Sequence, residues 1–158
     1  MAGNRFFHVN INVTDLDRSI AFYRLFGFEV IFRQRLDPET SKRTALAFAR
    51  EQNDAEYALV RIGDDPRATC LDLVQWKTRP TEGKPYALSN NAGMYRILVH
   101  VEDAEATLAA LAAAGVTPMG EVIRATAVPG KPPATMFCVT DPDGTVIEIA
   151  SGLDHLVD

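Results

Sequence analysis

Four ionisable residues recur at matching places in the two halves of this 158-residue chain. His8 and Arg96 lie 88 positions apart, each early in the first strand predicted for its half. Asp72 and Glu148 each stand between two branched aliphatic residues, in the last strand predicted for their half. Charged side chains are rarely placed alone in an apolar strand without a partner. We therefore expect the four side chains to point into one trough, where they can transfer protons and neutralise one another's charge.

One arrangement of these groups is purely electrostatic. Arg96 between Asp72 and Glu148 would form a buried ion triad, because a guanidinium can donate to two carboxylates at once. The same positive charge would hold both acids ionised, and it could also bind a carboxylate or another anion of a ligand.

The elements that must position these residues form an internal repeat. Residues 5–27 match residues 93–115 when the sequence is shifted by 88 positions, so that Asp15 faces Asp103 and Gly27 faces Gly115. Each copy reads as a strand followed by a helix. Two copies of one unit in so short a chain predict a pseudo-symmetric fold.

Alternate residues of the first predicted strand differ sharply in chemistry. One face carries His8, Asn10 and Asn12, whereas the other is apolar. We interpret the polar face as a concave, partly buried functional surface rather than a solvated one. Both asparagines could orient a ligand or satisfy neighbouring backbone groups. Trp76 and Phe137 could stack on a ligand or simply pack.

Each half is predicted to have the order βαβββ. The first helix should be capped at Thr14 and run to about Phe26. The remaining elements of the first half are strands at 28–36, 56–62 and 69–76. The second half is expected to contain strands at 94–101, 119–127, 134–140 and 145–150 and a helix at 103–114. Asp143-Gly144, between the last two strands, has the sequence of a tight hairpin turn.

The fold class that follows is α+β. We expect two βαβββ modules forming a curved, cup-like mixed sheet with the helices on its outer face. The first module spans 1–76, with an insertion at 39–55 that favours a short helix over a strand. A linker at 77–93 leads to the second module at 94–158, and together the modules form one compact domain.

Composition excludes several classes of protein. The apolar content of 47% is ordinary for a globular domain, and the net charge of −5 without any run of Lys or Arg argues against a nucleic-acid partner. No stretch approaches the ~18 apolar residues of a membrane span, and no signal peptide is recognisable at the amino end. We expect a cytoplasmic protein with no membrane partner, in which both cysteines, Cys70 and Cys138, are small buried hydrophobes.

Two phrases carry a resemblance to a known family. Residues 8–23 read HVNINVTDLDRSIAFY, and residues 141–148 read DPDGTVIE. They resemble the glyoxalase/bleomycin-resistance/dioxygenase group, also called the vicinal oxygen chelate superfamily. The resemblance implies paired βαβββ modules around a cup, usually in a homodimer. In enzyme members it also implies a divalent metal such as Zn, Ni, Mn or Fe.

Carried over residue by residue, the implied metal ligands are His8, Asp72 and Glu148, with Arg96 where a second His is commonly found. Arginine stays protonated and has no lone pair to offer a metal, so four ligands are not available. One His and two carboxylates could still hold a cation with open positions. The three-ligand metal site and the metal-free ion triad both stay open. His100 is about 13 Å further along the strand than Arg96, where it could act as an acid or base.

The resemblance implies an enzyme that acts next to a carbonyl or on vicinal oxygens, of isomerase, lyase or dioxygenase type. Glu148 or Asp72 would move the proton, and His100 or Arg96 would bind the anionic end of the substrate. The alternative is a metal-free, drug-sequestering protein that binds a small molecule, as bleomycin-resistance relatives do. A third alternative is that the ion triad only closes the core, since one fold hosts many activities.

Overall fold

The chain divides into two compact units, Met1–Gly83 and Lys84–Asp158. The computed structural model describes residues 3–37, 39–40, 54–86, 89–126, 129–131 and 133–156. The boundary between the units falls within residues 77–93, the segment predicted to be a linker.

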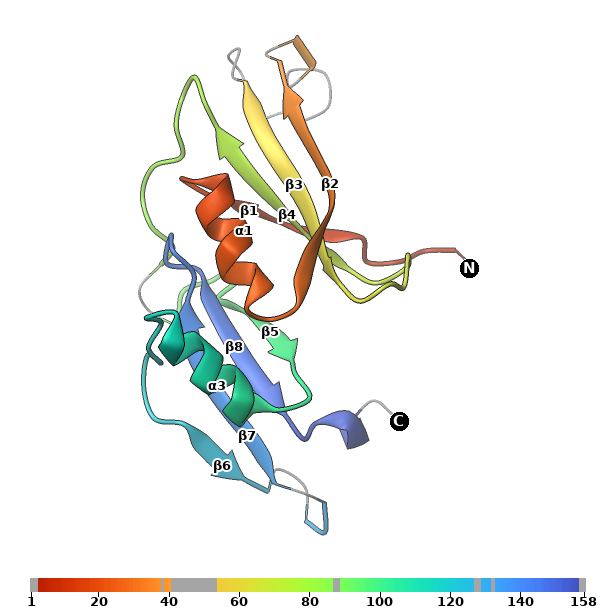
Figure 1. Cartoon of the computed structure of the whole chain (residues 1–158), viewed down its shortest axis with the longest axis vertical. Coiled ribbons are helices and arrows are strands. Elements are labelled where there is room, and N and C mark those ends of the chain that lie inside the picture. The colour runs from red at the N-terminus through yellow and green to blue at the C-terminus, as the bar shows by residue number, and fades with distance from the viewer. Residues whose placement is uncertain are drawn as a thin grey trace. The chain divides into compact units, whose positions relative to one another are not determined.

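The first unit contains a four-stranded mixed sheet and the helix α1 (Figure 1). Its elements are β1 (His8–Asn12), α1 (Leu16–Arg24), β2 (Phe28–Leu36), β3 (Ala55–Ile62) and β4 (Cys70–Trp76). The strand order is β1-β4-β3-β2. β1 runs parallel to β4, and the other two pairs are antiparallel. β4, which carries Asp72, is therefore an inner strand of the sheet.

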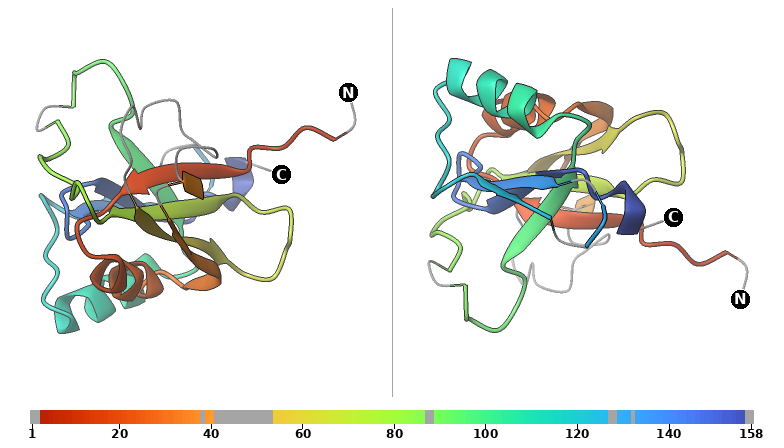
Figure 2. Two further views of the ribbon diagram at one scale, coloured as in Figure 1. Left: turned by 90° about the horizontal axis from the view of Figure 1, so that it is seen from above. Right: turned by 90° about the horizontal axis from the view of Figure 1, so that it is seen from below.

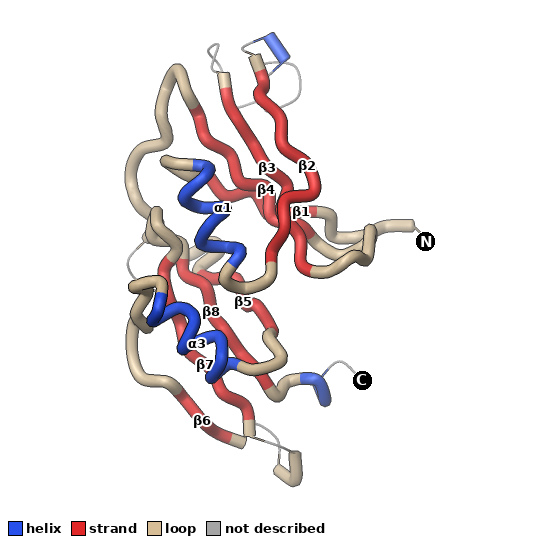
Figure 3. The backbone as a smooth tube through the Cα atoms, in the orientation of Figure 1, coloured by secondary structure: helices blue, strands red, loops and turns tan. Residues whose placement is uncertain are grey.

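The second unit repeats this topology (Figure 3). Its elements are β5 (Arg96–His100), α3 (Ala104–Ala113), β6 (Ile123–Ala125), β7 (Ala134–Thr140), β8 (Val146–Ser151) and a 3₁₀ helix at Asp154–Leu156. The strand order is β5-β8-β7-β6, and β5 is parallel to β8. The predicted α+β fold of two βαβββ modules is confirmed. β6 is shorter than the strand predicted at 119–127, of which residue 127 lies outside the described residues.

Equivalent acids cap the two helices. The Asp15 carboxylate accepts a hydrogen bond from the Arg18 backbone N–H, and Asp103 accepts from the N–H groups of Glu105 and Ala106. The predicted cap at Thr14 is wrong by one residue, because the aspartate that follows it takes the N-cap position. α1 also ends earlier than predicted, at Arg24 rather than about Phe26.

Each helix covers one side of its own sheet (Figure 2). In the first unit the helix-facing side of the inner strands is apolar, and Leu71, Leu73 and Val60 are each at most 4% exposed. In the second unit Ile147 and Ile149 have no exposed surface. Because side chains alternate along a strand, the polar residues between these positions lie on the face away from the helix.

Some of the predicted features lie only partly within the residues that the structure describes. The proposed insertion at 39–55 falls mostly on residues 41–53, which lie outside them, although Ala55 is already part of β3. Of the two cysteines, Cys70 is buried as predicted, whereas Cys138 is only half-buried; neither forms a disulfide. In the part of the chain that the structure describes, no helix is both long enough and apolar enough to cross a membrane.

The close packing of the backbone of residue 133 against Gly152 provides a test of the packing in the second unit. Its φ is +77°, and a Cβ there would lie 2.8 Å from the carbonyl oxygen of Pro133. We expect Gly152→Ala to lower the free energy of unfolding by more than the roughly 1–2 kcal/mol that a left-handed backbone costs a residue with a side chain. Urea denaturation measures the loss.

Gly115→Ala is the matched control. Gly115 has the same φ of +77°, but a Cβ there would meet no heavy atom within 4 Å. The control should therefore show the conformational cost alone. Equal losses in the two variants would mean that the contact with Pro133 adds nothing.

Candidate functional site

In the first unit, a carboxylate on the inner strand β4 is held by polar groups of β1. Asn10 lies opposite Asp72 in the parallel pairing, and its Nδ2 donates a 3.1 Å hydrogen bond to Asp72 Oδ2. His8 Nε2 is 3.9 Å from the same oxygen. The predicted polar face of β1 therefore has a specific task, because two of its residues surround Asp72.

Asp72 is poorly solvated for an ionisable group. Its side chain is 15% exposed, and its second carboxylate oxygen, Oδ1, is buried with no hydrogen-bond partner among the described residues. Burial raises the pKa of Asp72, and the hydrogen bond from Asn10 and the charge of His8 only partly oppose this shift. A carboxylate with a raised pKa is better prepared to accept a proton than a solvated one.

Aromatic residues share this face of the sheet. Strand register places Leu59 beside Asp72 and Phe32 beside Leu59, while Tyr57 follows along β3. The rings of Phe32 and Tyr57 are 5.8 Å apart. Burial, and after it the charge of Asp72, raises the pKa of Tyr57. Sequence analysis did not identify Tyr57, although the alternation within 55–62 could have placed it on the polar face once the pairing with β4 was known.

Trp76 and Asn12 contact each other. The indole N–H of Trp76 donates to Asn12 Oδ1 at 3.0 Å. Asn10 and Asn12 thus each hold a side chain of the neighbouring strand β4 in place. Ligand binding by Asn10, Asn12 and Trp76 stays a prediction.

In the second unit the charges are arranged differently. Arg96 Nε lies 2.5 Å from Glu148 Oε2, and the arginine side chain is 50% exposed while the glutamate is 14% exposed. Cys138 lies opposite Glu148 in the antiparallel pairing of β7 with β8. Burial, and after it the charge of Glu148, raises the pKa of the Cys138 thiol, so this side chain is a neutral neighbour of the ion pair.

Strand register confirms that the two halves are equivalent at this point. Asn10 pairs with Asp72 in the first unit, and Leu98 pairs with Glu148 in the second. In both units the ionic partner of the carboxylate is the residue two positions earlier on the first strand, His8 or Arg96. Leu59 and Cys138 are the corresponding neighbours on the other side.

Two other predicted site residues have different surroundings from those expected. His100 Nε2 is 3.6 Å from Asp154 in the C-terminal 3₁₀ helix, a partner that the sequence did not suggest. Phe137 is 3% exposed and pairs with Ile149, on the side of the sheet that faces α3. Its predicted ligand contact is therefore corrected to a role in the core. The next residue, Cys138, is the one that pairs with Glu148, so Phe137 points to the opposite face of the sheet.

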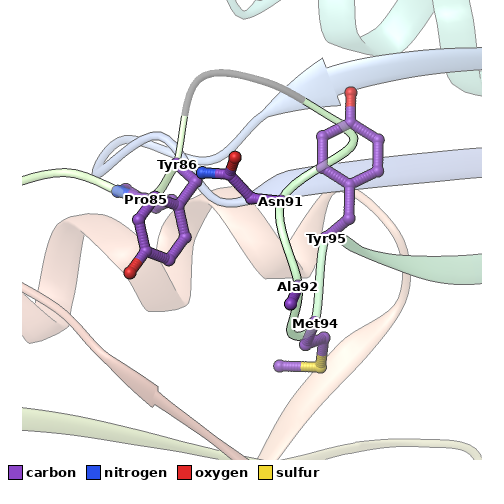
Figure 4. Close-up of a pocket in the computed structure, with 6 residues that line it drawn as sticks. All are labelled: Pro85, Tyr86, Asn91, Ala92, Met94 and Tyr95. Atoms are coloured by element: carbon purple, nitrogen blue, oxygen red, sulfur yellow. The ribbon is translucent and has the colours of Figure 1, made fainter.

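A shallow hollow lies in the segment that leads into β5 (Figure 4). Pro85, Tyr86, Asn91, Ala92, Met94 and Tyr95 line it. Its walls are open, since Tyr86 is 71% and Met94 65% exposed. The Tyr95 ring centroid is 5.8 Å from Arg96 Cζ, so the hollow begins beside the ion pair.

The donor groups of the two units fit a divalent metal unequally. In the first unit, the imidazole of His8 and the carboxylate of Asp72 are groups that could bind a cation. In the second, Arg96 has no lone pair, and its guanidinium already engages Glu148. No cluster of three or more His, Cys, Asp or Glu side chains suited to a metal ion occurs among the described residues. The donor groups of the second unit taken by themselves therefore do not fit the metal that the family resemblance implies.

His8 and Asp72 belong to one unit and Arg96 and Glu148 to the other. Each unit pairs its own carboxylate with a basic side chain from its own first strand. The ion triad that would join Asp72 to Arg96, and the meeting of all four side chains in one trough, stay predictions.

Comparison with protein families gives a match over almost the whole chain. Residues 5–149 match the model described as the Glyoxalase/Bleomycin resistance protein/Dioxygenase superfamily. No curated protein matches this sequence significantly.

Solved structures show the same fold. A glyoxalase family protein from Bacillus cereus is 23% identical with a TM-score of 0.78, and the alignment covers 96% of this chain and 97% of that one. Trypanothione-dependent glyoxalase I of Leishmania major is also 23% identical, with a TM-score of 0.67 and coverage of 98% and 91%. A glyoxalase family protein from Enterococcus faecalis is 22% identical, with a TM-score of 0.62 and coverage of 95% and 99%.

The raised pKa of Asp72 predicts an unusual stability profile. The folded-state pKa of Asp72 lies above its ordinary value of 3.8. Ionisation of Asp72 therefore lowers the free energy of unfolding, and this loss is absent below pH 3.8 and complete above the folded-state pKa. We expect Asp72→Asn to be more stable than wild type at pH 7, with the difference vanishing towards pH 3. Urea denaturation at both pH values measures it.

Asp54→Asn is a control for which we expect the opposite change in stability. Hydrogen bonds from Thr78 and Arg35 hold the pKa of Asp54 below its ordinary value, and its side chain is 14% exposed. Its replacement should destabilise the protein at pH 7, and the effect should fade as pH drops. If Asp72→Asn behaved like Asp54→Asn, Asp72 would be a stabilising ion-pair partner and not a strained functional group.

Proposed function

The chain belongs to the glyoxalase/bleomycin resistance protein/dioxygenase superfamily, and from this premise we propose that it is a small-molecule enzyme that moves a proton next to a carbonyl without a resident metal. The observation that supports this most is the state of Asp72, whose pKa is raised and whose Oδ1 is buried without a hydrogen bond. Residues whose pKa is perturbed by burial and by a specific partner are concentrated at active sites.

Asp72 is the proposed general base. It would accept the proton from a carbon next to a carbonyl, and the electron pair of that C–H bond would move to the carbonyl oxygen. Asn10 holds the carboxylate in place through its hydrogen bond to Oδ2. Glu148, the other candidate for this role, is less suitable because the permanently charged Arg96 already occupies its Oε2.

His8 is the proposed partner of the developing oxyanion. Its Nε2 is 3.9 Å from Asp72 Oδ2, close enough for both groups to reach one small substrate. A positioned imidazole can donate a hydrogen bond or a proton to the oxygen while the carboxylate takes the proton from carbon. The neighbouring rings of Phe32 and Tyr57 would shield this transfer from water.

The difference between the two units in their potential metal-binding groups supports the metal-free part of the proposal. Arg96 stands where the family commonly has a metal-binding imidazole, and it pairs with the adjacent carboxylate of Glu148. Its guanidinium supplies positive charge without a metal. Arginine is then an electrostatic group rather than a ligand.

The second candidate function is a binding protein without catalysis. It is favoured by the aromatic face of the first unit, where Phe32, Tyr57 and Trp76 could hold a planar ligand. Catalysis is the better explanation of Asp72, because sequestration of a ligand would not require a carboxylate whose pKa is raised by burial.

Proton exchange tests the enzyme proposal. Wild-type protein should accelerate the exchange of the C–H hydrogen next to the carbonyl in at least one member of a panel of α-hydroxy ketones and 2-oxo aldehydes in D₂O, followed by proton NMR. Asp72→Asn should lower that rate by about 10²–10⁴-fold, the usual contribution of a positioned base. Asp17→Asn, which removes an exposed partner of Arg33 on α1, should leave it unchanged.

Retention of the exchange rate in Asp72→Asn would show that another group is the base. The absence of exchange with every ketone and aldehyde, together with micromolar binding of one of them, would favour the sequestering protein.

Metal content tests the other half of the proposal. Arg96→His would give the second unit the imidazole–carboxylate pair that the first already has in His8 and Asp72. We expect wild type purified without added metal to contain less than one divalent ion in ten chains, and Arg96→His to gain one, as measured by elemental analysis. Arg124→His, which replaces an arginine paired with Glu105, is the control and should gain none.

A stoichiometric metal in wild type that is lost in Glu148→Ala would contradict this proposal. It would restore the ligand set His8, Asp72 and Glu148 that the resemblance implies.

A further inference from the structure

The polar face of the second unit combines a fixed positive charge with an apolar surface. Arg96 and Leu98 follow each other on this face of β5, and Leu98 is 47% exposed. Strand register places Met136 and Ala150 next to His100, and Cys138 next to Glu148. Ile123 of β6, which is 54% exposed, extends the same row beyond Met136. One end of the face is therefore charged and the middle is apolar.

The ion pair leaves part of the guanidinium unused. Arg96 contacts Glu148 through Nε, and its contacts among the described residues are this ion pair, the ring of Tyr95 and electrostatic proximity to Cys138. The two terminal nitrogens, Nη1 and Nη2, carry four further N–H donors. They make no hydrogen bond to any residue that the structure describes, and half of the side chain is exposed.

Glu148 makes the arginine a better receptor for an anion. A free arginine loses rotamer freedom when it binds, whereas a guanidinium already held at Nε has its outer edge oriented in advance. That outer edge matches the two oxygens of a carboxylate, which it can bind with two parallel hydrogen bonds.

The surroundings select for an apolar anion. The Cys138 thiol is neutral, because burial and Glu148 raise its pKa, and Leu98 presents a hydrocarbon surface about 7 Å along the strand from Arg96. A ligand with a carboxylate at one end and a short hydrocarbon body could satisfy both features.

We propose that Arg96, oriented by Glu148, is the receptor for the carboxylate of a ligand whose hydrocarbon part lies over Leu98. This inference goes beyond the proposed function, because the receptor lies within the second unit alone and does not depend on the proton transfer proposed for Asp72.

Binding of hexanoate and of its neutral isostere hexanamide, measured by titration calorimetry, tests the receptor. Wild type should bind hexanoate at least about tenfold more tightly than hexanamide, the factor that a charge-assisted hydrogen bond of about 1.4 kcal/mol gives. Arg96→Gln should remove the preference. Arg124→Gln is the matched control, because Nε and Nη2 of Arg124 both donate hydrogen bonds to Glu105. This variant should keep the preference for hexanoate.

Arg96→Gln leaves Glu148 without its counter-charge and could unfold the second unit. The double variant Arg96→Gln/Glu148→Gln avoids this, since removal of both partners of an ion pair costs far less than removal of one. It should fold and should bind hexanoate and hexanamide equally. Leu98→Ser tests the hydrocarbon contact, because it should weaken hexanoate several-fold while leaving acetate unchanged.

Equal affinity of wild type for hexanoate and hexanamide overturns this inference, as does a preference that survives in the double variant. These outcomes are separate from those for the base. Loss of proton exchange in Asp72→Asn with no carboxylate preference would keep the enzyme proposal and discard the receptor. A carboxylate preference without any exchange would keep the receptor and discard the enzyme.

Discussion

A carboxylate on an inner strand of a sheet must find a compensating group, and this requirement organises both halves of the molecule. Asp72 and Glu148 are 15% and 14% exposed, so neither can depend on water alone. The parallel first strand is the adjacent element that can supply a partner, and it does so in each unit at the same register position. β1 contributes His8 and Asn10, whereas β5 contributes Arg96.

The two solutions differ in what they leave available for chemistry. Arginine stays charged at every physiological pH, so the Arg96–Glu148 pair is a permanent feature of the second unit. Histidine can change its charge, and Asn10 compensates only one oxygen of Asp72. Duplication has therefore produced one half that is electrostatically fixed and one that is incompletely compensated. Such incomplete compensation costs stability and is typical of functional sites.

The aromatic and apolar neighbours follow from the same strand alternation. Helix-facing residues of the inner strands, such as Leu71 and Ile147, belong to the core, and the residues between them form a second surface on which buried residues such as Val74 and Ala150 lie among polar ones. In the first unit this surface carries Phe32 and Tyr57, and in the second Leu98 and Cys138. Leu59 in the first unit and Cys138 in the second occupy equivalent positions beside the two carboxylates.

The sequence by itself determined the repeat, the βαβββ order and the equivalence of His8 with Arg96 and of Asp72 with Glu148, because these depend on strand and helix periodicity and on a constant offset. It could not determine which carboxylate would be left incompletely paired, since that depends on cross-strand register and burial. Only the tertiary structure placed Phe137 in the core, Cys138 beside Glu148 and Asp154 beside His100. Those neighbours are far apart in sequence and come together through pairing of strands and docking of the C-terminal turn, for which a linear pattern carries no signal.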